Sequence, residues 1–361
     1  MTPFPEKTRH REYSLAIAAA MAALLLFTGT PGNLPLLFGL NALCAFSILY
    51  SAFSVVRHAD VLAHRFGEPF GSLILSLSIV VLEASLIVIL MLSGSAGSAM
   101  MRDTIYSVII IVMAGFIGFA LLLGGKKYHT QAYNFTGIKH FLISIMPLSI
   151  IVLVLPTAMG GGTLGAGQLV VVSLCCLLVY VYFLRIQTVT HRQFFVFEGE
   201  DSDGSHSTLS SHSSAWHFFM LAVHLVAVIA VTKLSSGVLE TFLQRLEAPK
   251  AATGFIVALL ILSPEGAGAF YSILQNQVQR AMNLLLGSVL ATISLTVPAV
   301  VLIATLTGQE LILGLELPDI ALLLGTLVVC QTSLTGGKTN VHSGAAHVAL
   351  FLAYLMLIFS A

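Results

Sequence analysis

The stretch SLILSLSIVVLEASLIVILML, residues 72–92, decides the class of fold. It is long enough to cross a hydrocarbon core as a helix, which takes about 20 apolar residues. Its only charged side chain is Glu83. A second stretch of this kind, GFIVALLILSPEGAGAFYSIL at residues 254–274, has Glu265 as its only charged side chain. Both stretches predict membrane-spanning helices that each hold one carboxyl group inside the bilayer.

The composition of the whole chain agrees with these two stretches. Of 361 residues, 57% are hydrophobic and 9% are charged, with a mean hydropathy of +0.97. Soluble domains carry about 25% charged residues, so a soluble enzyme is excluded. Transmembrane barrels alternate apolar and polar residues instead of forming long apolar runs. We therefore predict an all-α polytopic membrane protein whose partner is the lipid bilayer. The 16 basic residues balance 16 acidic ones, which gives no indication of nucleic-acid binding.

Eleven apolar segments are predicted to span the membrane. They cover roughly residues 14–30, 34–56, 70–93, 104–124, 140–159, 167–186, 215–235, 251–270, 283–306, 316–334 and 342–361. Residues 187–214 are acidic and rich in Ser and His, a composition that cannot bury a core. The predicted organisation is a tail with one extra helix (1–33), a five-helix repeat (34–186), a flexible linker (187–214) and a second five-helix repeat (215–361).

The loop charges predict the orientation. With the N-terminus in the cytoplasm, twelve Lys and Arg residues fall on the cytoplasmic side and four on the other side. Cytoplasmic loops are enriched in Lys and Arg. The N-terminus and the linker are therefore expected in the cytoplasm and the C-terminus outside, with a bacterial plasma membrane as the location.

Two units with an odd number of spans must insert with opposite orientations, as in the inverted repeats of secondary transporters. Glu83 and Glu265 each lie in the second span of their repeat. A charged group at mid-bilayer costs at least about 2.5–3.5 kcal/mol, so such residues are usually functional. The alternative is a pair of structural carboxyl groups, neutral or hydrogen-bonded within the bundle.

Two facing glutamates can hold either two protons or one divalent cation, which is the minimum chemistry of an antiporter. We expect Glu83 and Glu265 to bind the transported cation and the protons. Further oxygen ligands are expected from nearby polar residues: Ser76, Ser263, Gln275, Asn283, Ser288 and Thr292. Alternatively, the hydroxyl group of each serine or threonine in this set only bonds its own helix or a neighbouring one.

Other polar residues have weaker interpretations. Asp103 follows Arg102 at the start of a span and indicates either an entrance pair or an interfacial salt bridge. His217 and His224 lie seven residues apart on one helical face, which is compatible with a relay but more typical of packed histidines. The chain has no nucleotide or cofactor motif, so no cofactor is expected and an ion gradient is the expected energy source.

Four stretches resemble the bacterial calcium/proton antiporter branch, also described as sodium/potassium/calcium–proton antiporters, of the cation/Ca²⁺ exchanger superfamily. They are residues 67–92, LLLGGKKYHTQAYN (121–134), residues 263–300 and GGKTNVHSGAAHVALFLAYL (336–355). The resemblance implies two inverted repeats, each with one ion-binding glutamate, at Glu83 and Glu265. It also implies export of Ca²⁺ in exchange for protons by alternating access.

The chain departs from the family pattern next to both glutamates. Typical Ca²⁺/H⁺ exchangers have Gly-Asn-Ala-x-Glu, whereas this chain has Ile-Val-Val-Leu-Glu at 79–83 and Ile-Leu-Ser-Pro-Glu at 261–265. With fewer side-chain oxygens, exchange of Na⁺ or K⁺ is an open alternative to Ca²⁺. A Na⁺-coupled exchanger of the same fold is a second alternative. An intramembrane enzyme is disfavoured because no catalytic motif is present, and the oligomeric state is left open.

Overall fold

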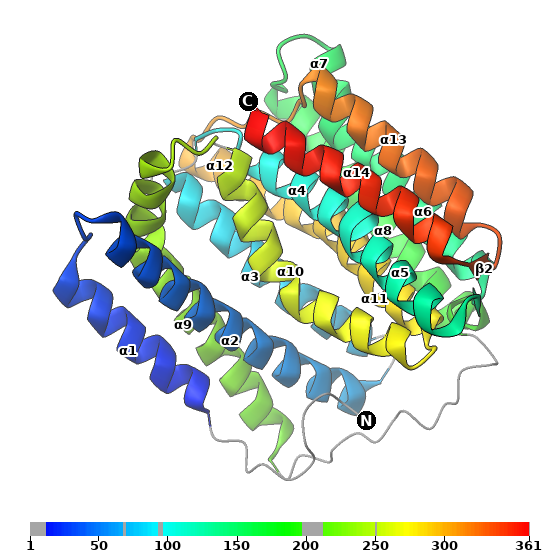
Figure 1. Ribbon diagram of the computed structural model, residues 1–361, viewed down its shortest axis with the longest axis horizontal. Helices are drawn as coiled ribbons and strands as arrows, with labels where there is room; N and C mark the ends of the chain where they lie inside the picture. Colours follow the sequence, from blue (N-terminus) through cyan, green and yellow to red (C-terminus); the bar gives the residue numbers. More distant parts are fainter. Residues whose placement is uncertain (1–11, 68–69, 93–96, 197–211, 250, 361) are drawn as a thin grey trace. The chain divides into compact units, whose positions relative to one another are not determined.

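The computed structural model describes residues 12–67, 70–92, 97–196, 212–249 and 251–360. Most of these residues are helical, and only two very short strands accompany the helices (Figure 1). In the described part, nine helices are long and apolar enough to cross a membrane, and shorter apolar helices cover Tyr13–Thr28 and Ser76–Leu92. Each of the eleven expected spans therefore corresponds to a helix. The chain is a multi-pass, all-α membrane protein.

Several helices continue beyond the apolar segment that predicted them. The helix expected at 34–56 runs to Phe66, and the one expected at 215–235 runs to Arg245. Hydropathy detects only the part of a helix that can lie in hydrocarbon, whereas backbone hydrogen bonding continues until a cap ends it. The first of these helices ends at Gly67, whose φ of 63° is readily adopted by glycine.

The chain packs as two compact units. Unit 1 comprises Met1–Met100 and Asp203–Pro264. Its helices are α1 (Tyr13–Thr28), α2 (Leu34–Phe66), α3 (Phe70–Leu92), α9 (Ser214–Arg245) and the first part of α10 (Ala251–Leu274). Helix α2 packs against α1, α3 and α9, and α9 also contacts α1 and α3 (Figure 1).

Unit 2 comprises Met101–Ser202 and Glu265–Ala361. Four of its helical segments contain a π-helical turn or end in one. These segments are α4–η1–α5 (Met100–Ile110, Ile111–Phe116, Ile117–Tyr128), α6–η2–α7 (Phe135–Ser149, Ile150–Val154, Leu155–Ala158), α8–η3 (Ala166–Arg185, Ile186–Thr190) and α11–η6–α12 (Val278–Ala291, Thr292–Thr296, Val297–Thr307). The rest of the unit contains the last part of α10, the short helix η4 (Arg192–Phe195), α13 (Leu317–Leu334) and α14 (Val341–Ser360).

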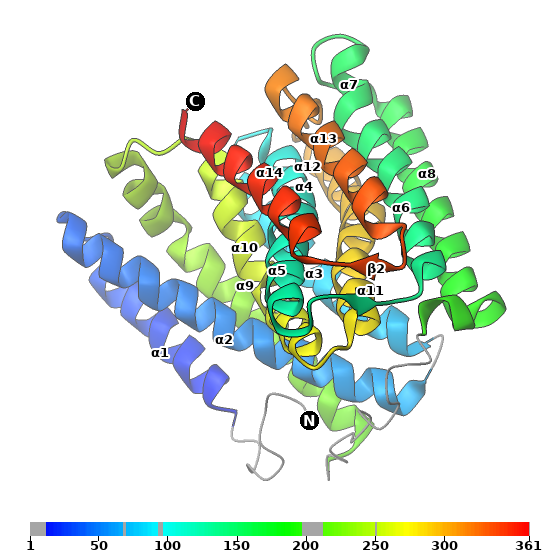
Figure 2. The same cartoon turned by 45° about the vertical axis from the view of Figure 1, so that its right-hand side comes forward.

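Helix α14 packs closely against α5 and α13 within unit 2 (Figure 2). A Cβ atom added to Gly118 would lie 2.9 Å from the backbone nitrogen of Val348. One added to Gly344 would lie 2.8 Å from the carbonyl oxygen of Gly118. Small residues let helix backbones approach closely in membranes, and these two glycines do so here. Next to α5 and α14, β1 (Gln131–Ala132) pairs antiparallel with β2 (Lys338–Thr339).

The two packing units are not the two predicted repeats. Unit 1 takes the first two spans of the first predicted repeat, and the first span and part of the second span of the second repeat. Unit 2 takes the last three spans of each repeat and the rest of α10. Helix α10 passes from one unit to the other between Pro264 and Glu265. The repeat boundaries and their inverted orientation stay predictions.

The predicted linker begins later than expected. Residues 186–190 form a π-helical turn that continues α8, and Phe195 in η4 packs against Phe141 and Phe183. Aromatic burial therefore holds residues 192–195 in unit 2. The acidic and Ser-rich remainder, residues 197–211, lies outside the described residues.

Candidate functional site

Glu83 lies near the middle of α3, with a fully buried side chain in unit 1. Val80 and Ile87 on the same helix are also buried, since α3 packs against α2 and α9. An ionised carboxyl group in such surroundings is costly unless it is paired. A bound proton or a bound cation removes that cost. Glu83 therefore has the environment expected of an exchange group.

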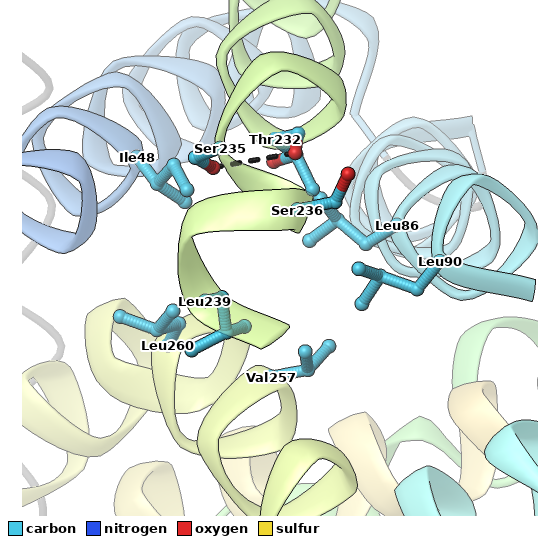
Figure 3. A pocket seen from close by; sticks show the side chains of 9 residues that line it. All are labelled: Ile48, Leu86, Leu90, Thr232, Ser235, Ser236, Leu239, Val257 and Leu260. Atoms are coloured by element: carbon cyan, nitrogen blue, oxygen red, sulfur yellow. Dashed lines mark hydrogen bonds between the residues drawn. The ribbon is translucent and has the colours of Figure 1, made fainter. Parts of the chain in front are cut away.

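A small cavity of about 30 Å³ lies within unit 1 (Figure 3). Leu86 and Leu90 line it, and they follow Glu83 by three and seven residues on one stripe of the helix. Thr232 from α9 also lines it, and its buried hydroxyl oxygen has no hydrogen-bond partner among the described residues. The cavity has room for roughly two water molecules. Unit 1 thus offers a partly polar space along the face of α3 that carries Glu83.

Glu265 is only 3% exposed and lies in unit 2. The Ser288 hydroxyl group on α11 donates a hydrogen bond to Oε2 of Glu265. This contact links α10 to α11 through two of the residues that the sequence analysis selected. A donor aimed at a carboxylate stabilises its charged form. Binding of a cation by Glu265 and Ser288 stays a prediction.

The residues on either side of Glu265 fix its place in α10. Pro264 has no backbone N–H, so the helix lacks one hydrogen bond immediately before the glutamate. Gly266 leaves room for an aromatic ring, because a Cβ atom there would lie 2.6 Å from Cε2 of Phe116. Phe116 in turn packs edge-on against Phe270. Glu265 is therefore held between a local break in the helix and a tight aromatic contact.

Thr292 is 2% exposed and begins the π-helical turn η6, one turn after Ser288. Its position immediately after α11 keeps it a candidate ligand beside Ser288. Ser294 in the same turn is fully buried, and its hydroxyl oxygen has no hydrogen-bond partner among the described residues. Ser294 was not among the predicted ligands, and a regular helix would turn it away from Ser288. The Thr292-x-Ser294-x-Thr296 pattern before Pro298 was the available signal.

Three other predicted ligands are not brought to Glu265. The Asn283 side chain donates to the carbonyl oxygen of Phe195 at 2.7 Å and thereby holds η4. Gln275 is exposed in the turn after α10, about 15 Å along the helix axis from Glu265 at 1.5 Å per residue. The Ser263 hydroxyl group donates to the carbonyl oxygen of Leu259 at 2.6 Å, which is bonding within its own helix.

Ser76 is half-buried on α3, seven residues before Glu83. This spacing places the two residues on one face of the helix, about 10 Å apart along its axis. The distance is too long for Ser76 and Glu83 to hold the same ion without a water molecule between them. A direct role for Ser76 stays a prediction.

Asp103 forms an ion pair with Arg102, with 2.8 Å between Nε and Oδ1. Arg102 also donates to the carbonyl oxygen of Gly314 at 3.2 Å. These contacts fasten the start of α4 to the segment before α13, as an interfacial salt bridge does. An entrance role for Asp103 stays a prediction.

The comparisons with known proteins agree with this arrangement of helices. The sequence profile described as "Sodium/calcium exchanger protein" matches residues 36–189 and 216–360. The chain belongs to the sodium/calcium exchanger protein family. Membership of this family makes it a membrane transporter and not an enzyme.

Individual relatives of this transporter extend the comparison. It is 55% identical to the sodium-potassium/proton antiporter ChaA of Escherichia coli K12, over 98% of each chain. It is 23% identical to the Ca²⁺/H⁺ antiporter ChaA of Bacillus subtilis 168, over 65% of this chain and 68% of the relative. The solved structure of native YfkE has the same fold, with a TM-score of 0.74 at 18% identity, covering 96% of this chain and 100% of that one.

Removing the Ser288 hydroxyl group is expected to weaken cation binding in this exchanger. A hydrogen bond to a charged group contributes about 1.5–3 kcal/mol. We expect Ser288→Ala to raise the cation concentration for half-maximal proton flux about 10-fold. The matched control is Ser149→Ala, since Ser149 is a buried serine of unit 2 that, among the described residues, bonds the Ile145 carbonyl of its own helix. An unchanged half-maximal concentration in Ser288→Ala would remove Ser288 from the site.

Adding a methyl group at Gly266 is expected to destabilise the protein. The new Cβ would collide with the ring of Phe116, and overpacking a core costs about 1–3 kcal/mol. We expect Gly266→Ala to lower the thermal unfolding midpoint in detergent micelles, and Phe116→Leu to restore part of the loss. Gly237→Ala is the control, because nothing lies within 4 Å of a Cβ there. Equal midpoints for Gly266→Ala and Gly237→Ala would contradict the contact.

Proposed function

We propose that this chain is a cation/proton antiporter in which Glu83 and Glu265 carry either protons or the transported cation. The observation that carries the proposal is the burial of both carboxyl groups, at 0% and 3% exposure, in a chain of the exchanger family. A buried carboxyl group is stable with a bound proton or a bound cation and unstable with neither. Protons and cations therefore compete for the same oxygens.

Competition becomes exchange when the glutamates open to one side of the membrane at a time. On one side the cation leaves and protons replace it, and on the other side the reverse occurs. The empty and charged form is the costly one, so it rarely crosses between the two exposures. This coupling needs no cofactor. Joint action of Glu83 and Glu265 is part of the proposal and rests on their equivalent places in the predicted repeats.

We place Na⁺ and K⁺ first as the transported cations, ahead of the Ca²⁺ that the sequence analysis placed first. Support comes from the 55% identical relative, which is named a sodium-potassium/proton antiporter. Ca²⁺ prefers six to eight oxygen ligands, and the Asn of the typical Ca²⁺/H⁺ pattern is absent before both glutamates. Ca²⁺ is the second candidate, favoured by the charge of two carboxylates and by the Bacillus subtilis relative named for Ca²⁺.

The location follows from the same reasoning. We place the chain in a bacterial plasma membrane, with the N-terminus and the linker in the cytoplasm and the C-terminus outside. The twelve-to-four distribution of Lys and Arg supports this orientation. Labelling of single cysteines introduced at residues 205 and 361 tests it, since residue 361 should react from outside and residue 205 should not.

The experiment that tests the function is proton flux in inverted vesicles or proteoliposomes with an imposed pH gradient. Addition of Na⁺, K⁺ or Ca²⁺ is expected to dissipate the gradient, with choline as the control cation. A chain that moves cations but leaves the proton gradient unchanged would be a Na⁺-coupled exchanger instead. No response to any of the three cations would overturn the proposal.

A further inference from the structure

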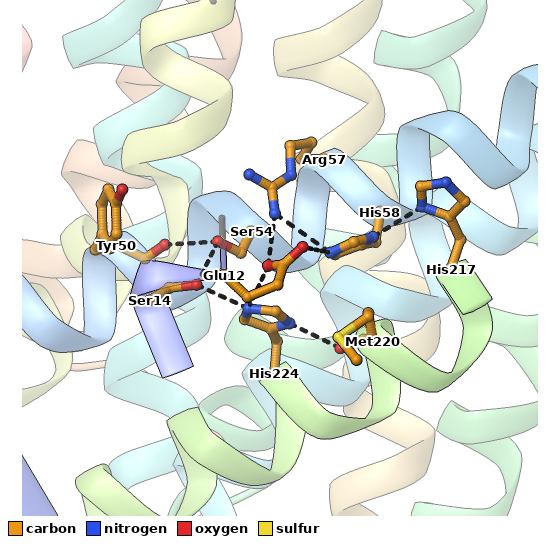
Figure 4. Close-up of polar contacts among 9 residues, drawn as sticks. All are labelled: Glu12, Ser14, Tyr50, Ser54, Arg57, His58, His217, Met220 and His224. Atoms are coloured by element: carbon orange, nitrogen blue, oxygen red, sulfur yellow. Dashed lines mark hydrogen bonds and ion pairs between the residues drawn. The ribbon is translucent and has the colours of Figure 1, made fainter. Parts of the chain in front are cut away.

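A second group of buried ionisable side chains lies entirely within unit 1 and is separate from the two glutamates. We call it the histidine–glutamate cluster: Glu12, His58, His217 and His224 (Figure 4). Glu12 immediately precedes α1, His58 lies on α2, and the other two histidines lie on α9. The cluster thus joins three helices at one point. His58 is 2% exposed and His224 is fully buried.

The ligand atoms of three members converge. Nε2 of His58 lies 3.5 Å from Oε1 of Glu12, and Nε2 of His224 lies 3.4 Å from Oε2 of Glu12. All three ligand atoms lie within 4.8 Å of one another. Ligands held tetrahedrally at about 2.0–2.1 Å from a zinc ion lie about 3.3 Å apart. The two distances to Glu12 are already close to that spacing, and the three atoms together would need a contraction of at most about 1.5 Å.

Hydrogen bonds indicate which ring nitrogen of His224 carries the hydrogen. Nδ1 of His224 lies 2.8 Å from the carbonyl oxygen of Met220, so it carries the hydrogen and leaves Nε2 as an acceptor. Nε2 of His224 accepts from the Ser14 hydroxyl group at 2.8 Å. Metal-binding histidines usually donate their other N–H to a carbonyl or carboxylate group in this way.

His58 is arranged in the same manner. Arg57 can only donate, and its Nη2 atom lies 3.3 Å from Nε2 of His58. Nδ1 of His58 then carries the hydrogen and donates to Nδ1 of His217 at 2.8 Å. His217 is therefore a second-sphere partner that orients the His58 ring. Nε2 of each histidine therefore lies next to the carboxylate of Glu12, where a metal ion would replace the hydrogen bonds from Ser14 and Arg57.

We propose that Glu12, His58 and His224 form a binding site for a divalent transition-metal ion of the Zn²⁺ class. Two imidazole nitrogens and one carboxylate are a common zinc ligand set, with water in the fourth position. Imidazole ligands suit Zn²⁺, Ni²⁺ and Cu²⁺, whereas Ca²⁺ prefers oxygen ligands only. The site is therefore chemically distinct from that of the transported cation. A bound ion would fasten the start of α1 to α2 and α9.

Arg57 is the group with which the metal ion must compete. Its Nη2 atom lies 2.9 Å from Oε2 of Glu12, and its side chain is 28% exposed, so it can turn toward solvent. Removing Arg57 should strengthen metal binding.

The test measures binding of Zn²⁺ by the purified full-length protein in detergent, with any affinity tag removed. We expect one high-affinity ion per chain at pH 7.5, and X-ray absorption should show nitrogen and oxygen ligands at about 2.0–2.1 Å. His58→Ala or His224→Ala should weaken binding at least about 100-fold, because even second-sphere changes such as His217→Ala cost about 10–100-fold. The matched control is His342→Ala, at an exposed histidine of unit 2.

The variant Arg57→Gln distinguishes a metal site from an ion pair that only stabilises the fold. A metal site predicts tighter Zn²⁺ binding in this variant and a larger zinc-induced rise in the unfolding midpoint. If either histidine variant fails to fold, Glu12→Gln is the substitute test. It leaves both histidines in place and should weaken Zn²⁺ binding. Equal Zn²⁺ binding in the wild type and the folded His224→Ala protein would overturn the proposal. So would a wild-type protein that binds no Zn²⁺ at micromolar concentrations, or one in which Ca²⁺ displaces it equally well.

Discussion

Glu265→Gln is expected to abolish cation-driven proton flux while the protein remains folded. An amide cannot ionise, so it neither releases a proton nor balances the charge of a cation. The substitution keeps nearly the same shape and leaves one oxygen to accept from the Ser288 hydroxyl group. Folding should therefore be retained, and insertion into the membrane should become easier because a charged group is removed. Flux in proteoliposomes is the measurement, alongside elution volume and unfolding midpoint.

Two further variants make the result for Glu265 specific. Glu310→Gln changes an exposed glutamate of unit 2 and should leave flux unchanged. Glu265→Asp keeps the charge but moves the oxygens by about one methylene group, so we expect weakened but measurable exchange. Robust cation-driven flux in folded Glu265→Gln protein would defeat the proposed mechanism.

Glu83→Gln, in unit 1, is expected to abolish cation-driven proton flux as completely as Glu265→Gln does in unit 2. Its fully buried side chain offers a carboxyl group that an amide cannot replace in proton exchange. Asp103 is already paired with Arg102, so Asp103→Asn should be much milder. Glu240→Gln, at a partly exposed glutamate of α9, is the control within unit 1. Flux is again measured with Na⁺, K⁺ and Ca²⁺ added separately.

The double variant Glu83→Gln/Glu265→Gln tests joint action of the two residues. Groups that act as one unit are strongly non-additive, so the double variant should be no worse than either single one. If each single variant instead keeps about half of the flux and only the double variant loses it, the glutamates act independently. That outcome would contradict a shared exchange cycle.

The membrane fold could be predicted from the sequence because hydrocarbon imposes a length and an apolar composition on every span. Both deep glutamates could also be found, because a lone carboxyl group in an apolar run is conspicuous. Helix ends could not be placed, since α2 and α9 continue through interfacial residues that hydropathy does not detect. The π-helical turn that begins at Thr292 was hidden for a different reason, because it depends on packing and not on local composition.

Contacts between distant segments account for most of what the sequence analysis missed. His217 and His224 were selected as a pair on one helical face, but their partners are 159 and 210 residues away, at His58 and Ser14. No periodicity can indicate such pairings. The same holds for Asn283, which was predicted as an ion ligand and instead binds the backbone of Phe195. Polar residues at helical spacing indicate a shared face, but not what that face contacts.

The close approach of Gly118 to Gly344 has a consequence for how this protein is made. Helix α5 is synthesised and inserted more than 200 residues before α14. Until then, the narrow face at Gly118 lacks its final neighbour, and the carbonyl oxygen of Met113 lacks the contact that it later makes with His347 at 2.6 Å. Unit 2 can therefore be completed only when the last helix leaves the ribosome and reaches the bilayer. Premature termination anywhere before α14 would leave an early helix incompletely packed, a state that membrane quality-control proteases can recognise.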